Sequence, residues 1–284
     1  MRLLRLALAM LSLLAVAEST TGNSSWSLEE SVCGSFKEPF AFWLWSIGAG
    51  KPNPEAASRL PNVEPITHKT KDGRVLRGYK LSSTAADGVV RGTVLMAQGN
   101  AMLADQLLSS LNSFSQAGIE TYVFDYRGYG NSEGKRRLKA IVSDYRELYE
   151  SISASTKGGR LLYGISFGGV VLLNVVGSGV SFDGVVIDST PSRVSHLGCP
   201  EKYDPVANFP KDGSRFLLIA GNKDKVVPLK DSQKLIDLAK ARGSRTEVQP
   251  DYAHPFMDSD IEVHQRRLEL IKSFLIESAS QGAQ

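Results

Sequence analysis

The sequence predicts an α/β fold in which a mostly parallel sheet is covered by helices on both faces. Apolar segments of strand length alternate with helix-period segments over about 200 residues, with no linker between them. The strand-length segments are continuously apolar, which is typical of strands buried on both faces of a parallel sheet. A turn-rich pair of segments ahead of them predicts a β-hairpin, which would add an antiparallel edge.

The expected elements of the first half begin with that hairpin, over residues 66–81, whose turn holds Asp72 and Gly73. The segments that follow are an apolar strand over 93–98, a helix from Leu103 to about Gly118, a strand over 121–126 and a helix through Ile141, Tyr145 and Leu148. The elements of the second half are a strand over 160–165, a buried helix over 167–176, strands over 184–189 and 216–221, an amphipathic helix over 229–243, a strand over 246–251 and a final helix over 261–276.

Residues 1–17 predict a secretory signal peptide. Arg2 and Arg5 precede an apolar run that ends in Ala15-Val16-Ala17, an A-x-A cleavage pattern. The alternative is an uncleaved membrane anchor, but the run of about a dozen residues is shorter than the roughly 20 that a spanning helix needs. We therefore expect the mature chain to begin at Glu18 and to be exported, either to a periplasm or out of the cell.

The composition of the 284 residues is that of an ordinary globular protein, with 42% hydrophobic and 22% charged residues. The formal net charge of +3 falls to +1 when Arg2 and Arg5 leave with the signal peptide. Because no basic stripe or charge run remains, we expect no nucleic-acid partner.

Two cysteines, Cys33 and Cys199, are the only ones in the chain. An even pair in an oxidising compartment favours a disulfide, and two unrelated thiols are the alternative.

Asn23 opens an N-glycosylation sequon, which matters only in a eukaryotic host.

Residues 18–61 predict an irregular N-terminal extension that contains an aromatic cluster: Phe40, Phe42, Trp43 and Trp45. Packing of this cluster on the main domain is the favoured interpretation. Contact with a membrane surface and a cover over a binding site are the alternatives.

Ser166 lies in the pattern Gly164-Ile165-Ser166-Phe167-Gly168, between a predicted strand and a predicted helix. A serine that must project above a sheet edge needs a sharp turn, in which flanking side chains would collide unless they are glycines. The following helix also directs backbone N–H groups towards the site. This context indicates a nucleophilic serine, although glycines that only permit close packing are the plainer interpretation.

A serine hydroxyl needs a base to become a nucleophile, and the chain offers four histidines. His254 follows the last predicted strand, at the carboxyl edge where α/β sheets bind ligands. The other three fit less well, because His68 lies in the hairpin, His264 in the last helix and His196 in the loop after the sixth strand.

Asp224 is the favoured partner for His254, because it follows the strand over 216–221 at the same edge. The order Ser166, Asp224, His254 is the one that this sheet topology uses. Asp188, at the end of the strand over 184–189, is the rival, and its plainer interpretation is a turn or capping residue.

An acyl-transfer site also needs donors for an oxyanion. The N–H of Phe167, next to the serine, is one candidate. The other is the N–H of Asn100, in the loop Gln98-Gly99-Asn100 after the strand over 93–98. The alternative for this loop is a plain strand-to-helix turn.

The motifs QGN (98–100), DYRGYGNSEG (125–134), GISFGG (164–169), GNKDKVVP (221–228) and DYAHPF (251–256) together resemble the α/β-hydrolase fold serine hydrolases, over about residues 66–276. They are most similar to a small-lid branch with an HGN-type oxyanion loop and a DYRGYGxSEG loop. The resemblance implies an eight-stranded sheet within a catalytic domain over residues 62–279. It also implies nucleophile, acid and base roles for Ser166, Asp224 and His254, and oxyanion donors at Asn100 and Phe167. Gln98 replaces the family's histidine, and we expect catalysis to survive because the donor lies beyond it.

The segment between the sixth and seventh strands, about residues 191–214, is short. It predicts a flap rather than the inserted cap domain that many family members carry. Because Cys199 lies in this segment, a disulfide to Cys33 would hold the aromatic extension beside the mouth of the site.

These observations predict an exported serine hydrolase that cleaves carboxylic esters or thioesters through an acyl-enzyme on Ser166, without a metal or organic cofactor. The expected substrate is a small molecule or a lipid that carries an acyl group, with contact to a membrane surface as a further expectation. A serine peptidase of the same fold is the nearest alternative, and a catalytically silent binding protein is the alternative from another class.

Overall fold

The computed structural model describes residues 27–281 of the chain. The predicted signal peptide, the sequon at Asn23 and the start of the extension lie outside the described residues. Within the described range, none of the helices combines the length and apolar character that a membrane crossing requires.

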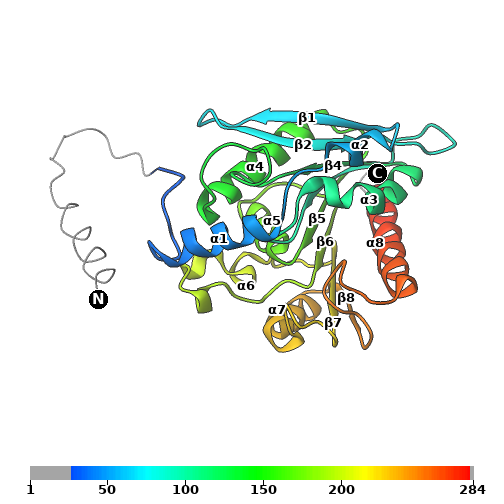
Figure 1. The fold of residues 1–284 in the computed structure, drawn as a ribbon. Coiled ribbons are helices and arrows are strands. Elements are labelled where there is room, and N and C mark those ends of the chain that lie inside the picture. Colours follow the sequence, from blue (N-terminus) through cyan, green and yellow to red (C-terminus); the bar gives the residue numbers. More distant parts are fainter. Residues whose placement is uncertain (1–26, 282–284) are drawn as a thin grey trace, which may run out of the picture.

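An eight-stranded sheet forms the centre of the fold (Figure 1). Its strands lie in the order β1-β2-β4-β3-β5-β6-β7-β8. β1 is antiparallel to β2 and β2 is antiparallel to β4, whereas all later neighbours are parallel. The predicted fold class, including the antiparallel edge, is therefore confirmed. The strands are β1 (Val63–Lys69), β2 (Val75–Leu81), β3 (Gly92–Ala97), β4 (Ile119–Phe124), β5 (Gly159–Ile165), β6 (Gly184–Asp188), β7 (Phe216–Gly221) and β8 (Arg245–Gln249).

Helices cover both faces of this sheet (Figure 1). One apolar core lies between the sheet and α4 (Leu138–Ser155), α5 (Phe167–Gly177) and α7 (Leu229–Ala241). The second core lies on the other face, under α3 (Leu108–Gln116) and α8 (Ile261–Gln281). β3, β6 and β7 are buried along their whole length, and β5 is buried except at Arg160, as their continuous apolar runs predict.

The described part of the N-terminal extension, residues 27–61, contains two helices, so the prediction of an irregular segment was wrong there. It contains α1 (Lys37–Gly48) and the short α2 (Pro54–Ser58). The aromatic cluster lies on α1, which buries Phe42 against Phe167 with ring centroids 5.4 Å apart. A helix is recognised in a sequence by apolar residues that recur on one face. α1 has apolar side chains on both its inner and its outer face, so this periodicity is lost.

The flap between β6 and β7 contains only short helical turns: η2 (Ser195–Leu197), η3 (Glu201–Tyr203) and α6 (Pro205–Asn208). A disulfide joins Cys199 of this flap to Cys33 of the extension, as the sequence predicts. The covalent bond ties the polypeptide just ahead of α1 to the flap.

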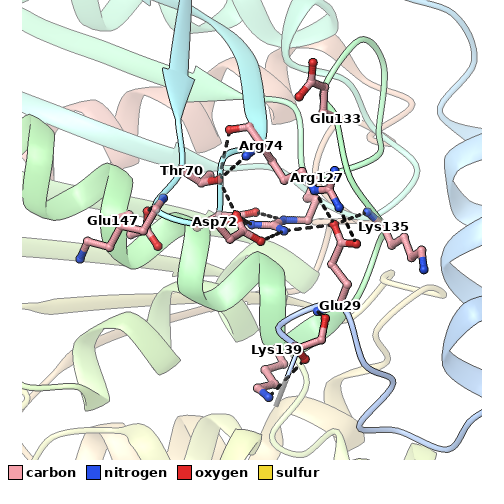
Figure 2. A network of polar contacts seen from close by, with 12 residues as sticks. Glu29, Thr70, Asp72, Arg74, Arg127, Glu133, Lys135, Lys139 and Glu147 are labelled. Carbon is pink, nitrogen blue, oxygen red and sulfur yellow. Dashed lines mark hydrogen bonds and ion pairs between the residues drawn. The ribbon is translucent and has the colours of Figure 1, made fainter. Parts of the chain in front are cut away.

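Arg127, which is itself buried, anchors the extension a second time through the polar network shown in Figure 2. Its guanidinium donates to Asp72 in the β1–β2 turn at 2.6 and 3.0 Å, to Asp144 of α4 at 2.8 Å, and to Glu29 of the extension at 3.2 Å. Hydrogen bonds from Arg127 are the main reason why the pKa of Asp72 falls to about 2. One buried cation therefore connects three segments that are distant in sequence.

Candidate active site

Ser166 occupies the sharp turn between β5 and α5. Its backbone has φ 52° and ψ −114°, a region that residues other than glycine rarely adopt. The N–H of Ser166 donates to the carbonyl of Asp188 at 2.8 Å, which ties the turn to the end of β6. A strained backbone at this position is typical of the strand-to-helix turn that the glycine pattern predicts.

The glycines around Ser166 have the steric role that the pattern predicts. A Cβ at Gly164 would lie 2.8 Å from the carbonyl oxygen of Gly168 and from backbone atoms of Gly169. A Cβ at Gly168 would overlap the carbonyl oxygen of Ala97 at the end of β3. Side chains at either position would push α5 away from the sheet and displace the turn.

His254 and Asp224 form a buried pair at the carboxyl edge of β7 and β8. His254 Nδ1 lies 2.8 Å from Asp224 Oδ2, and the other carboxylate oxygen accepts the N–H groups of Val226 and Val227, each at 2.8 Å. Burial alone would raise the pKa of Asp224, but the hydrogen bonds from His254 and from the backbone hold it below its ordinary value. Asp224 is thus kept ionised beside the imidazole. Because Nδ1 is the ring nitrogen that faces Asp224, Nε2 takes no part in this pair.

Asp188, the rival acid, has a different position. Its carboxylate is fully buried, with Oδ2 3.8 Å from the guanidinium of Arg267 on α8. Burial raises its pKa, although Arg267 and the nearby His254 act in the opposite direction. Among the described residues no hydrogen bond joins Asp188 to His254, so the imidazole is oriented by Asp224.

The loop that carries His254 is held from α8. Arg267 donates to the carbonyl of Ala253 at 2.8 Å and lies 3.3 Å from Asp258, whose other oxygen accepts the N–H of Ala253 at 2.8 Å. The guanidinium also stacks on Tyr252, 4.2 Å from the ring centroid. No sequence pattern indicates this anchor, because Arg267 resembles any basic residue on a helix surface.

The remaining histidines lie in other environments. His68 is on β1, and His264 is on α8 within 3.5 Å of Ser110. His196 is exposed on the flap, where it lines the same cavity as Ser166. Of the three, only His196 belongs to the surroundings of the serine.

No hydrogen bond connects Ser166 Oγ to His254 in the described part of the chain. Both residues nevertheless lie near Asp188, at the end of β6. The Ser166 N–H donates to the Asp188 carbonyl, and the charges of His254 and Asp224 affect the pKa of the Asp188 carboxyl group. Such serine–histidine contacts often close only when substrate is bound.

A cavity of about 420 Å³ opens beside Ser166. Its walls come from α1, the flap, the β3–α3 loop and the start of α7. Trp45 of α1 and the cationic side chains of Arg193, Lys230 and Lys234 are part of this lining, and the sequence did not assign them to the site. The lysines lie on an amphipathic helix, where charge ordinarily indicates only a solvated face.

Asn100 and Phe167, the predicted oxyanion donors, line this cavity together with Ser166. Gly99 lies close to the serine, since a Cβ there would be 3.8 Å from Ser166 Cβ. Neither the N–H of Asn100 nor that of Phe167 has a hydrogen-bond acceptor among residues 27–281. Both donors are thus available to a ligand.

Gln98, which replaces the family's histidine, points into the core instead of the cavity. Its amide nitrogen donates to the Phe124 carbonyl at 2.9 Å, and its amide oxygen accepts the Tyr145 hydroxyl at 3.2 Å. The replacement therefore changes the support beneath the loop and leaves the backbone at Asn100 free. In the described range, no cluster of three or more His, Cys, Asp or Glu side chains could hold a metal ion.

Known proteins share this architecture. A protein-family model described as serine aminopeptidase, S33, matches residues 88–210. The chain is 27% identical over 229 residues to the uncharacterized protein YfhR of Escherichia coli K12, an alignment that covers 73% of this chain and 79% of that protein.

Two solved structures show the same fold at low sequence identity. An α/β hydrolase from Vibrio vulnificus superposes with a TM-score of 0.64 at 18% identity, covering 83% of this chain and 94% of that one. A soluble variant of monoglyceride lipase from Saccharomyces cerevisiae gives a TM-score of 0.62 at 15% identity, covering 80% and 99%. Together with the family model, these similarities show that the chain has the α/β-hydrolase fold.

Proposed function

We propose that the protein is a serine hydrolase that cleaves carboxylic ester or thioester bonds through an acyl-enzyme on Ser166. The observation that carries this proposal is the placement of Ser166, on a strained turn, at the sheet edge that holds the His254–Asp224 pair. A serine with only a packing role would not need a positive φ.

The proposed reaction begins with His254 Nε2, which takes the proton from Ser166 Oγ as the oxygen attacks the acyl carbon. Asp224 holds the opposite ring N–H and stabilises the imidazolium that forms. The N–H groups of Asn100 and Phe167 stabilise the oxyanion of the tetrahedral intermediate. The bond from carbon to the alcohol or thiol then breaks, and His254 returns the proton to that leaving group.

Deacylation repeats these steps with water. His254 takes a proton from the water, whose oxygen bonds to the acyl carbon, and the carbon–Oγ bond breaks as the proton returns to Ser166. The acid product leaves and the enzyme is restored. Protons pass only between Ser166, His254, the leaving group and water, so these steps need no cofactor.

The nearest alternative is a serine peptidase, which uses the same groups on an amide. An aminopeptidase must hold a cationic amino terminus near the serine. The cavity instead combines three cationic side chains, Arg193, Lys230 and Lys234, with one carboxylate, Asp231. This balance disfavours a positively charged substrate and supports an ester or thioester.

Hydrolysis of p-nitrophenyl esters, compared with aminoacyl p-nitroanilides, separates the two activities. We expect ester hydrolysis by the wild type, its loss in Ser166→Ala and little amide cleavage. Faster turnover of the anilides would favour the peptidase. A catalytically silent binding protein would hydrolyse neither substrate and would not react with a fluorophosphonate.

Export and contact with a lipid surface are part of the proposal. The signal-like N-terminal sequence and the disulfide both support an oxidising compartment. The outer face of α1, defined by Phe36, Phe40, Trp43, Leu44 and Ile47, leaves half or more of each side chain exposed. A cluster of aromatic and aliphatic side chains of this kind supports insertion into a membrane interface.

A further inference from the structure

A second cavity, of about 390 Å³, lies between α1 and the body of the enzyme. Its walls include Ala41 and Phe42 of α1, Leu138 at the start of α4, and both cysteines of the disulfide. Its volume falls in the range of ligand-binding pockets, which begins near 300 Å³. The N-terminal extension therefore borders a space large enough for part of a substrate.

The second cavity adjoins the one beside Ser166. The residues that line both are Trp45, Phe167, Val194, His196 and Leu197. Phe167 follows the serine directly, and its ring contacts Phe42 and Trp45 with centroids 5.4 and 6.3 Å apart. A group bound to Ser166 and extended past Phe167 would thus enter the space under α1.

The lining of the second cavity is mostly apolar, and its polar members apart from Glu38 are the exposed residues Lys37 and His196. Glu38 is its only carboxylate, and it is 3% exposed. Its oxygens already accept the N–H groups of Val32, Cys33 and Leu138 at 2.6–2.7 Å and the Ser31 hydroxyl at 3.0 Å. The carboxylate is therefore committed to fixing the extension on α4 and is not available to bind a polar ligand.

We propose that the cavity under α1 is the acyl-chain subsite of the enzyme, so that its substrates are long-chain fatty acyl esters or thioesters. The inference rests on the proposed function, because the acyl carbon must reach Ser166. The N-terminal extension forms one wall of this subsite, and the Cys33–Cys199 disulfide is part of its lining.

Chain length tests the subsite kinetically. We expect kcat/KM for p-nitrophenyl esters to rise by about fourfold per added methylene group until the cavity is filled, since a buried methylene contributes roughly 0.8 kcal/mol. The measured series is butanoyl, octanoyl, dodecanoyl and hexadecanoyl. A value that is flat or falls beyond butanoyl would overturn the inference.

Ala41→Phe provides the matched perturbation, because Ala41 lines the second cavity and not the first. The larger ring should lower kcat/KM for the dodecanoyl ester at least tenfold and leave that for the butanoyl ester within twofold. Ala86→Phe, the same change in an exposed loop, is the control and should alter neither. An equal loss for both esters in Ala41→Phe would contradict a separate acyl subsite.

Calorimetric titration of dodecanoate into Ser166→Ala makes the test independent of catalysis. We expect Ser166→Ala to bind dodecanoate. The Ser166→Ala, Ala41→Phe double variant should bind it at least tenfold more weakly. Dodecanoate binding by a wild-type protein without esterase activity would support the subsite and rule out the proposed function. Esterase activity with neither chain-length preference nor dodecanoate binding would support the proposed function and rule out the subsite.

Discussion

Removal of the disulfide should weaken the folded state by several kcal/mol while leaving the fold intact. The bond closes a loop of 166 residues between the extension and the flap. In the chain-entropy model such a loop stabilises the native state by about 5 kcal/mol, and native disulfides typically contribute about 2–5 kcal/mol. The Cys33→Ser, Cys199→Ser double variant should therefore lose about 2–5 kcal/mol.

The extension has other attachments that should keep it docked in this variant. Glu38 accepts the N–H of Leu138 at 2.7 Å, Arg127 binds Glu29, and Phe42 packs on Phe167. We therefore expect native circular dichroism and hydrolysis of the butanoyl ester close to that of the wild type.

Urea unfolding of the two proteins, followed by circular dichroism, measures this difference. The midpoint should shift to lower urea with nearly the same slope, because both proteins expose similar surface on unfolding. Wild type in dithiothreitol should approach the variant, whereas the variant should not respond to dithiothreitol. Free energies of unfolding that agree within about 0.5 kcal/mol would refute the reasoning, since the entropic constraint would then be absent.

Three further predictions follow from the contacts described above. Asp224→Asn should lower kcat for ester hydrolysis by about 10³–10⁴ in steady-state assays, because His254 loses the group that fixes its tautomer; activity within tenfold of wild type would contradict this role. Asp72→Asn should cost about 1–2 kcal/mol of unfolding free energy at pH 7, after allowance for screening. Because the folded-state pKa of about 2 lies below the ordinary 3.8, this difference should be full above pH 3.8 and disappear as the pH falls towards 2, and a pH-independent difference in urea titrations would exclude the ion pair. Co-sedimentation with phosphatidylcholine vesicles should fall at least fivefold in Phe40→Ser, Trp43→Ser, while the butanoyl esterase activity stays constant; equal sedimentation would remove α1 as the lipid contact.

The sheet and the polar residues at its carboxyl edge were predictable because the signals are local. Continuous apolar runs identify β3, β5 and β7, and the glycines around Ser166 identify the strained turn. His254 could be chosen over the other histidines because chain order and sheet topology fix which loops meet at one edge.

The helix α1 and the cavities beneath it were not predictable in the same way. α1 is apolar on both its inner and its outer face, so it has no clear helical period, and its conformation depends on packing against Phe167. The cavity walls combine segments that are distant in sequence, such as Trp45 and Lys230. No local sequence pattern indicates which distant segments will meet to form a cavity wall.

Labelling with a fluorophosphonate, followed by peptide mapping, is the most direct test of the central claim that Ser166 is an activated nucleophile. We predict one adduct, on Ser166, that is absent in Ser166→Ala and forms at least 100-fold more slowly in His254→Ala, which lacks the base. An adduct on another residue, or no adduct on the folded wild-type protein, would contradict the account.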